Sequence, residues 1–182
     1  MHATICDLMT DLVQNAVEAS ATRIELTIHE TIENIEFEVK DNGKGMNQET
    51  QAKAVDPFYS DGRKHAHRRV GLGLPFLFQT AEAAGGCAEI ESQEGVGTVI
   101  RFRAQAQHVD LPPFGDFSST AAMMLTLLPE GELTIAKTRN GDGYSFCRSE
   151  LNEALGDLHS AGSLQLLKTY IASQEEDLRK AG

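Results

Sequence analysis

The sequence lacks any apolar run long enough to cross a membrane. Its longest apolar stretches lie around 70–78 and 121–128, far short of the roughly 20 residues that span a bilayer. The first residues, Met1-His2-Ala3-Thr4, contain no basic segment followed by an apolar one, so no secretory signal is visible. We therefore expect a cytoplasmic protein without a membrane span.

Cysteine is scarce as well. The chain contains 3 cysteines, an odd number, and they are widely spaced without a CxxC pair. This pattern argues against a disulfide framework and against a zinc knuckle, and it favours thiols kept in a reducing compartment. The three residues are Cys6, Cys87 and Cys147.

Basic residues are also few. The chain has 16 Lys and Arg against 27 Asp and Glu, which gives a formal net charge of −11. Nucleic-acid surfaces are rich in Lys and Arg, so we expect no nucleic-acid partner. A nucleotide ligand is still compatible with this charge, because a single basic loop can supply the local field. Residues 61–69 are predicted to be such a loop, with four basic side chains against one acidic.

What is present is typical of a folded protein. Apolar residues make up 41% of the 182 residues, a length that suits one domain or one domain plus a small appendage. Apolar positions recur at helical spacing over 5–20 and with period two over 24–28 and 35–39. Further helices are predicted at 47–55 and 71–84, and further strands at 87–91 and 98–103. This order predicts an α+β fold in two layers, with antiparallel strands in one and helices in the other.

A proline-containing segment follows this first part. Residues 105–115 include Pro112-Pro113 and are predicted to be a linker. Beyond them the patterns predict a helix over 117–128 capped by Asp116, a hairpin turning at Asn140-Gly141, and helices at 149–155 and 163–178. We assign 1–104 to the main domain and 116–182 to a small α+β C-terminal extension of unknown role. Its helices either form a docking surface or pack against the first sheet.

Two polar motifs lie on predicted elements, one on the side of the first helix and one at the end of the second strand. Asp11 and Asn15 are four residues apart on the first helix, so both project from one side. A carboxylate and a carboxamide placed in this way can orient a water molecule and bind Mg²⁺. Asp41 ends the second strand and is followed by Gly43 and Gly45. A carboxylate there can accept a hydrogen bond from an exocyclic amine, while the glycines permit close backbone approach to a ligand.

A third motif, residues 70–75, opens a helix with two glycines. Such a helix start can turn backbone N–H groups toward an anion. Its spacing fits neither a Walker loop nor a Rossmann fingerprint. Each motif taken singly also fits an ordinary turn or helix face. Their order on a helix, a strand end and a glycine-opened helix is much more specific.

In this order the motifs resemble the GHKL ATP-binding superfamily, the Bergerat fold of gyrase, heat-shock chaperone, histidine kinase and mismatch-repair ATPases, over about 7–102. The resemblance implies ATP and Mg²⁺ as cofactors. Asn15 would be the magnesium ligand, Asp11 would hold the position of the general base of the ATPase branches, and Asp41 would bind the adenine amino group. The other nucleotide-binding residues would be Gly43, Gly45 and Met46 near the base, Arg63, Lys64, Arg68 and Arg69 in an ATP lid, Gly71, Leu72, Gly73 and Leu74 at the phosphates, and Thr98 near the adenine.

Three functions follow from the resemblance and stay open at this point. The first is a Mg-ATP-binding histidine kinase-like protein that lacks its own phosphoacceptor helix, because the sequence begins almost at the Asp11 helix. It would act by phosphotransfer in trans to an unidentified protein partner, or as a nucleotide-dependent signalling switch. The second is an ATPase that couples hydrolysis to lid closure and partner exchange. The third is a non-catalytic regulatory module of the anti-sigma or scaffold type. A homodimer is compatible with all three.

Overall fold

The first helix begins at a well-formed cap. The structure, a computed structural model, describes residues 4–55, 73–128 and 130–181. Helix α1 spans Ile5–Glu18. The Thr4 hydroxyl accepts a hydrogen bond from the Asp7 backbone N–H at 3.1 Å, and the Asp7 carboxylate accepts one from the Thr4 N–H at 2.9 Å. This reciprocal capping satisfies two N–H groups that the first turn of a helix leaves free.

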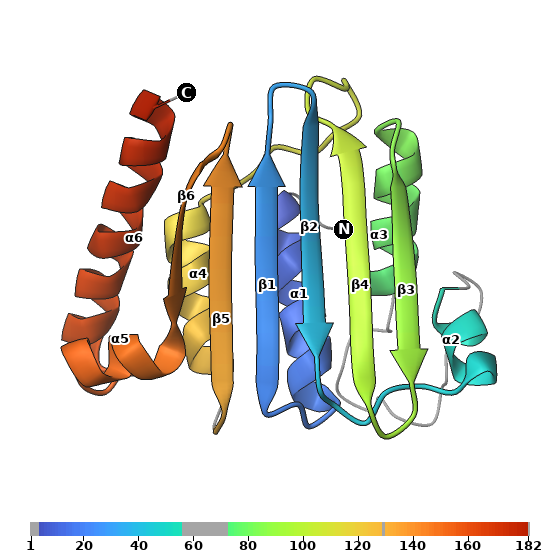
Figure 1. Cartoon of the computed structure of the whole chain (residues 1–182), viewed down its shortest axis with the longest axis horizontal. Helices are drawn as coiled ribbons and strands as arrows, with labels where there is room; N and C mark the ends of the chain where they lie inside the picture. Colours follow the sequence, from blue (N-terminus) through green and yellow to red (C-terminus); the bar gives the residue numbers. More distant parts are fainter. Residues whose placement is uncertain (1–3, 56–72, 129, 182) are drawn as a thin grey trace.

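A sheet of six strands forms the second layer. Its order is β3-β4-β2-β1-β5-β6, with β1 and β5 parallel and the other neighbours antiparallel (Figure 1). The strands are β1 (Arg23–Glu30), β2 (Asn34–Asp41), β3 (Cys87–Gln93), β4 (Gly97–Gln105), β5 (Glu132–Arg139) and β6 (Asp142–Cys147). The predicted strands are present and form the antiparallel hairpins β1–β2, β3–β4 and β5–β6, and pairing continues beyond the apolar patterns into the flanking polar residues.

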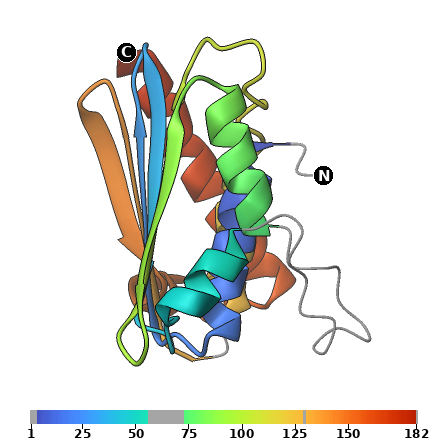
Figure 2. The same ribbon diagram turned by 90° about the vertical axis from the view of Figure 1, so that its right-hand side faces the viewer.

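The helices cover one face of the sheet and leave the other open (Figure 2). Besides α1 they are α2 (Gln48–Ala54), α3 (Gly73–Ala83), α4 (Phe117–Leu127), α5 (Arg148–Leu155) and α6 (Ala161–Ala181). The covered face holds the hydrophobic core, where the rings of Phe37 and Phe102 stack with their centroids 4.7 Å apart. Alternate side chains of each strand point to this face, which explains the period-two pattern. The two-layer α+β fold predicted from the sequence is confirmed.

The residues after 105–115 continue the same sheet and the same core. Strand β5 pairs with β1 along its whole length, from Arg23↔Glu132 to Glu30↔Arg139. Helix α4 packs against α1 and α6. The segment before α4 is tied to the start of α1, because the Ile5 and Cys6 N–H groups donate to the carbonyl oxygens of Pro113 and Phe114 at 3.0 and 2.9 Å. Strand β5 and helix α4, which belong to 116–182, thus pack directly against β1 and α1.

Within the described residues, no helix is both long and apolar enough to cross a membrane. The longest, α6, buries a narrow stripe at Ser163, Leu167, Ile171, Glu175 and Leu178. It extends beyond the predicted 163–178 at both ends.

Candidate functional site

The motif residues gather at one end of the sheet. Strand β2 ends there, β4 begins there, and the C-terminal end of α1 and the start of α3 lie on the covered face beside them (Figure 1). The Lys44 N–H donates to the Ala19 carbonyl oxygen at 2.9 Å, which ties the loop after β2 to the end of α1. Motifs separated by tens of residues in the sequence therefore share one corner of the fold.

Asp41 is the last residue of β2 and is half-buried. One of its carboxylate oxygens accepts a hydrogen bond from the Gly43 N–H at 2.7 Å. Partial burial raises the pKa of the Asp41 carboxyl above its ordinary value, while hydrogen bonds from the backbone N–H groups of Gly43 and Thr98 oppose the rise. These hydrogen bonds fix the orientation of the Asp41 carboxylate, and its oxygens can still accept a further hydrogen bond from a ligand.

Thr98 and Ser92 extend Asp41 into a polar row across three strands. Asp41 pairs with Thr98 in the β2–β4 register, and Thr98 pairs with Ser92 in the β4–β3 register. The two hydroxyl oxygens lie 2.9 Å apart, and the Met46 N–H donates to Ser92 Oγ at 2.8 Å. Thr98 is only 8% exposed. The row therefore connects the Asp41 carboxylate to the loop that carries Met46.

The loop after Asp41 needs glycine at two positions. A Cβ on Gly43 would lie 2.9 Å from both the Ala19 Cβ and an Asp41 carboxylate oxygen. Gly45 has φ +62°, and a Cβ there would lie 1.9 Å from the Gln93 carbonyl oxygen. The Gly95 N–H in turn donates to the Lys44 carbonyl oxygen at 2.7 Å. The loop is thus pressed between α1 and the β3–β4 turn, and glycine at these two positions permits this close packing.

Helix α1 presents Asp11, Asn15 and Ala19 at four-residue spacing along one side. Gly43 lies against Ala19, and a Cβ on Gly73 would lie 3.2 Å from an Asp11 carboxylate oxygen, so the start of α3 lies against Asp11. Asp11 and Ala19 are eight positions apart, which corresponds to about 12 Å along the helix axis. Asn15 is exposed midway along this line. The side of α1 thus connects the Asp41 loop to the start of α3.

The remaining predicted site residues lie either at the start of α3 or outside the described residues. Gly73 and Leu74 form the first turn of α3, and Leu74 is half-buried against the core. The predicted contacts Arg63, Lys64, Arg68, Arg69, Gly71 and Leu72 lie outside the described residues. Across the parts of the chain that are described, no group of three His, Cys, Asp or Glu side chains is arranged to hold a metal ion. Magnesium often keeps few protein ligands and binds substrate phosphates instead, so the exposed Asn15 fits such a role.

Sequence reasoning missed two residues of this corner. Asn42 Oδ1 accepts hydrogen bonds from the Thr22 and Arg23 N–H groups at 2.9 and 2.8 Å, and its Nδ2 donates to the Thr22 hydroxyl at 3.0 Å. Ser92 holds Thr98 and Met46 as described above. Asn42 looks like a plain turn residue, and the contacts of Ser92 depend on strand register. The one available signal was that Ser92 follows Ala88 and Ile90 on the core-facing side of β3.

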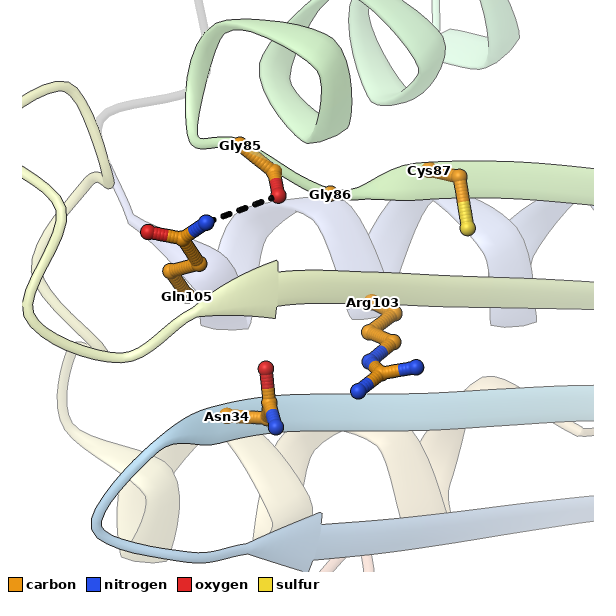
Figure 3. A pocket seen from close by; sticks show the side chains of 6 residues that line it. All are labelled: Asn34, Gly85, Gly86, Cys87, Arg103 and Gln105. Atoms are coloured by element: carbon orange, nitrogen blue, oxygen red, sulfur yellow. Dashed lines mark hydrogen bonds between the residues drawn. The ribbon is translucent and has the colours of Figure 1, made fainter.

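A shallow pocket of about 300 Å³ lies at the opposite end of the sheet (Figure 3). It is lined by Asn34, Gly85, Gly86, Cys87, Arg103 and Gln105. Gln105 Nε2 donates to the Gly85 carbonyl oxygen at 3.3 Å, and Arg103 Nε pairs with Glu36 at 3.1 Å. None of the motif residues lines it, so it is separate from the corner described above.

The part of the chain that contains this corner matches a known ATPase family. The family described as "Histidine kinase-, DNA gyrase B-, and HSP90-like ATPase" matches residues 3–108, more than half of the chain. The chain belongs to this family, the GHKL ATPases, as the order of its motifs indicated.

Individual relatives are sensor kinases. The matching region is 31% identical over 96 residues to the sensor histidine kinase YvrG of Bacillus subtilis (strain 168), covering 51% of this chain and 17% of that protein. It is 34% identical over 95 residues to the sensor-type histidine kinase PrrB of Mycobacterium leprae (strain TN), covering 52% and 21%. The chain therefore spans about a fifth of the length of these relatives.

A solved structure covers the C-terminal part as well. The N-terminal domain of a DNA repair protein superposes on 90% of this chain and 59% of its own, with a TM-score of 0.54 and 13% sequence identity. At this identity the likeness concerns the fold alone.

Proposed function

We propose that this protein binds Mg-ATP at the corner formed by α1, the loop after β2 and the start of α3, and that it acts as a histidine kinase-like signalling protein. The observation that carries the proposal is the line from Asp41 through Ala19 and Asn15 to Asp11 and Gly73. It has a half-buried carboxylate at one end and a helix start at the other.

The roles follow from the chemistry of each position. Asp41 accepts a hydrogen bond from the adenine amino group, with Gly43, Gly45, Met46 and Thr98 around the base. The backbone N–H groups at the start of α3 face the phosphates, where the helix dipole favours negative charge. Asn15 lies between these two ends and supplies an oxygen to Mg²⁺. When bound, Mg²⁺ neutralises phosphate charge. The basic residues of 61–69 add further phosphate contacts.

Phosphotransfer goes to a partner in trans. The histidines within the described ranges, His29, His108 and His159, lie on β1, after β4 and between α5 and α6. None of them is on α1, α3 or the loop after β2. In this proposal a protein partner offers the phosphoacceptor, or else the nucleotide state itself is the signal. We place this activity in the cytoplasm.

Calorimetric titration with ATP and Mg²⁺ tests the binding proposal. We expect the wild-type protein to bind and Asp41→Ala to lose binding. Asp142→Ala is the matched control, because Asp142 is an exposed carboxylate on β6, far along the sheet from β2 and β4. Unchanged binding in Asp41→Ala, or no binding by the wild type, contradicts the proposal.

An ATPase that couples hydrolysis to partner exchange is the second candidate, and the position of Asp11 favours it. Asp11 lies against Gly73, at the end of the line where the terminal phosphate is expected. A general base must reach the attacking water there. If Asp11 has this role, Asp11→Asn abolishes steady-state phosphate release and leaves ATP affinity nearly intact. Persistent turnover in Asp11→Asn excludes the role. Binding without either turnover or transfer indicates a regulatory module.

A further inference from the structure

The Ser92 hydroxyl is surrounded by three polar groups at hydrogen-bonding distance. The Met46 N–H lies 2.8 Å away, the Thr98 hydroxyl 2.9 Å and the Gly97 carbonyl oxygen 3.1 Å. A serine hydroxyl has one proton to give and two lone pairs with which to accept. The Met46 N–H only donates and the Gly97 carbonyl only accepts. The remaining question is which of the two hydroxyls, Ser92 or Thr98, donates the hydrogen bond between them.

One arrangement satisfies all three contacts. Ser92 gives its proton to the Gly97 carbonyl oxygen and accepts from the Met46 N–H and from the Thr98 hydroxyl. In the reverse arrangement Ser92 gives its proton to Thr98, and the contact with Gly97 O has no proton in it. Because buried polar groups are paired wherever geometry allows, the first arrangement is preferred, and the Thr98 proton points to Ser92.

The Thr98 oxygen is then left as an acceptor beside a second acceptor. Thr98 and Asp41 are directly paired across β4 and β2 on the covered face, where opposite side chains lie about 5 Å apart. The Asp41 carboxylate and the Thr98 hydroxyl oxygen can then both accept hydrogen bonds, which suits a ligand group with two N–H donors. The exocyclic amino group of a 6-aminopurine has two such donors, whereas a 6-oxopurine presents a carbonyl oxygen at that place.

We propose that Ser92 is a positioning residue that sets the base preference of the site, by holding the Thr98 proton away from the ligand so that a 6-aminopurine is favoured over a 6-oxopurine. The proposal rests on the function proposed above. Without the Ser92 hydroxyl, the Thr98 proton is released and can be donated to a 6-oxo group. Loss of the Met46 contact loosens the loop for both bases alike, so the ratio of the two affinities isolates the effect on Thr98.

The experiment compares Mg-ATP with Mg-ITP by calorimetry. We expect the wild type to prefer ATP and Ser92→Ala to lower the ATP-to-ITP affinity ratio by about three- to tenfold, the effect of one hydrogen bond. In a Thr98→Val background the same change should leave the ratio unaltered, because Ser92 then has no hydroxyl to orient. Ser145→Ala, an exposed serine on β6, is the matched control and should keep the wild-type ratio.

The outcomes separate the two proposals. Equal losses of ATP and ITP affinity in Ser92→Ala, with the ratio unchanged, overturn the role of Ser92 and leave the nucleotide site standing. Absence of binding of either nucleotide to the wild type overturns both. If Ser92→Ala does not fold, Ser92→Cys keeps the size with a weaker hydrogen-bonding group and must lower the ratio as well.

Discussion

The ammonium nitrogen of Lys137 lies 2.7 Å from a carboxylate oxygen of Glu175, and the two side chains are only 3% and 10% exposed. A Glu30 oxygen lies at the same distance on the other side, and the Tyr144 hydroxyl donates to Glu175 at 2.6 Å. The Lys137 nitrogen also lies 4.2 Å from the centroid of the Phe114 ring. Five segments of the chain therefore meet at one buried cation, which fastens α6 to the covered face of the sheet.

Removing this cation should strongly destabilise the fold. Lys137→Met leaves two buried carboxylates without their partner, a change that costs about 3–5 kcal/mol. The triple variant with Glu30→Gln and Glu175→Gln should recover much of this loss, because no buried charge remains. Denaturant unfolding measures both. The control is Lys180→Met. Lys180 forms an ion pair with Glu176 but is 66% exposed, so we expect its free energy of unfolding to change by less than about 0.5 kcal/mol. Similar effects at the two lysines would contradict the buried role.

Asp41→Asn should stabilise the ligand-free protein at pH 7. The pKa of the Asp41 carboxyl is raised in the folded state, chiefly by burial, so the ionised form is the one that folding disfavours. The amide keeps an oxygen for the Gly43 N–H and carries no charge. The advantage over wild type is complete above the raised pKa and shrinks as the pH falls through it toward the unfolded value of about 3.9. Thermal melts between pH 7 and 4 measure this, and a pH-independent difference would refute it. If Asp41→Asn is more stable than the wild type but no longer binds ATP, the loss of binding is not caused by unfolding.

Alanine at Gly45 should be much more damaging than alanine at Gly95. Both glycines have positive φ, +62° and +77°, so each substitution bears a similar conformational cost of about 1–2 kcal/mol. A Cβ at Gly45 would lie 1.9 Å from the Gln93 carbonyl oxygen, whereas one at Gly95 meets nothing within 4 Å. We expect Gly45→Ala to displace the loop and weaken nucleotide binding as well as stability. Gly95→Ala serves as the matched control, and equal effects on binding would show that the close approach is unimportant.

The thiols should differ in reactivity. Burial raises the pKa of the Cys6 thiol to about 11, so about 0.1% is ionised at pH 8, and the thiolate is the reactive form. Cys87 is exposed on β3. Alkylation of the native protein followed by mass spectrometry should label Cys87 first and Cys6 only after denaturation. Early labelling of Cys6 would show that the start of α1 opens readily.

The sequence by itself determined the local elements and the class of protein. Helix α1, the turns and the alternating strands follow from spacing, capping and turn residues, which act within a few positions of the chain. The motifs around Asp11, Asp41 and Gly73 could be recognised for the same reason, because each is a short stretch of sequence on one helix, one strand end or one helix start.

Only the tertiary structure decided which distant residues meet. The parallel pairing of β5 with β1 and the contact of Gly73 with Asp11 depend on chain crossings that no local pattern encodes. Ser92 and Thr98 meet within the β3–β4 hairpin, but the position of Thr98 beside Asp41 depends on the pairing of β4 with β2. Lys137 lies on the same side of β5 as the buried Leu133 and Ile135, yet its stability there depends on Glu175, a residue 38 positions away. Local propensity acts along the chain, whereas burial and charge pairing act through space, so these contacts appeared only once the chain was folded.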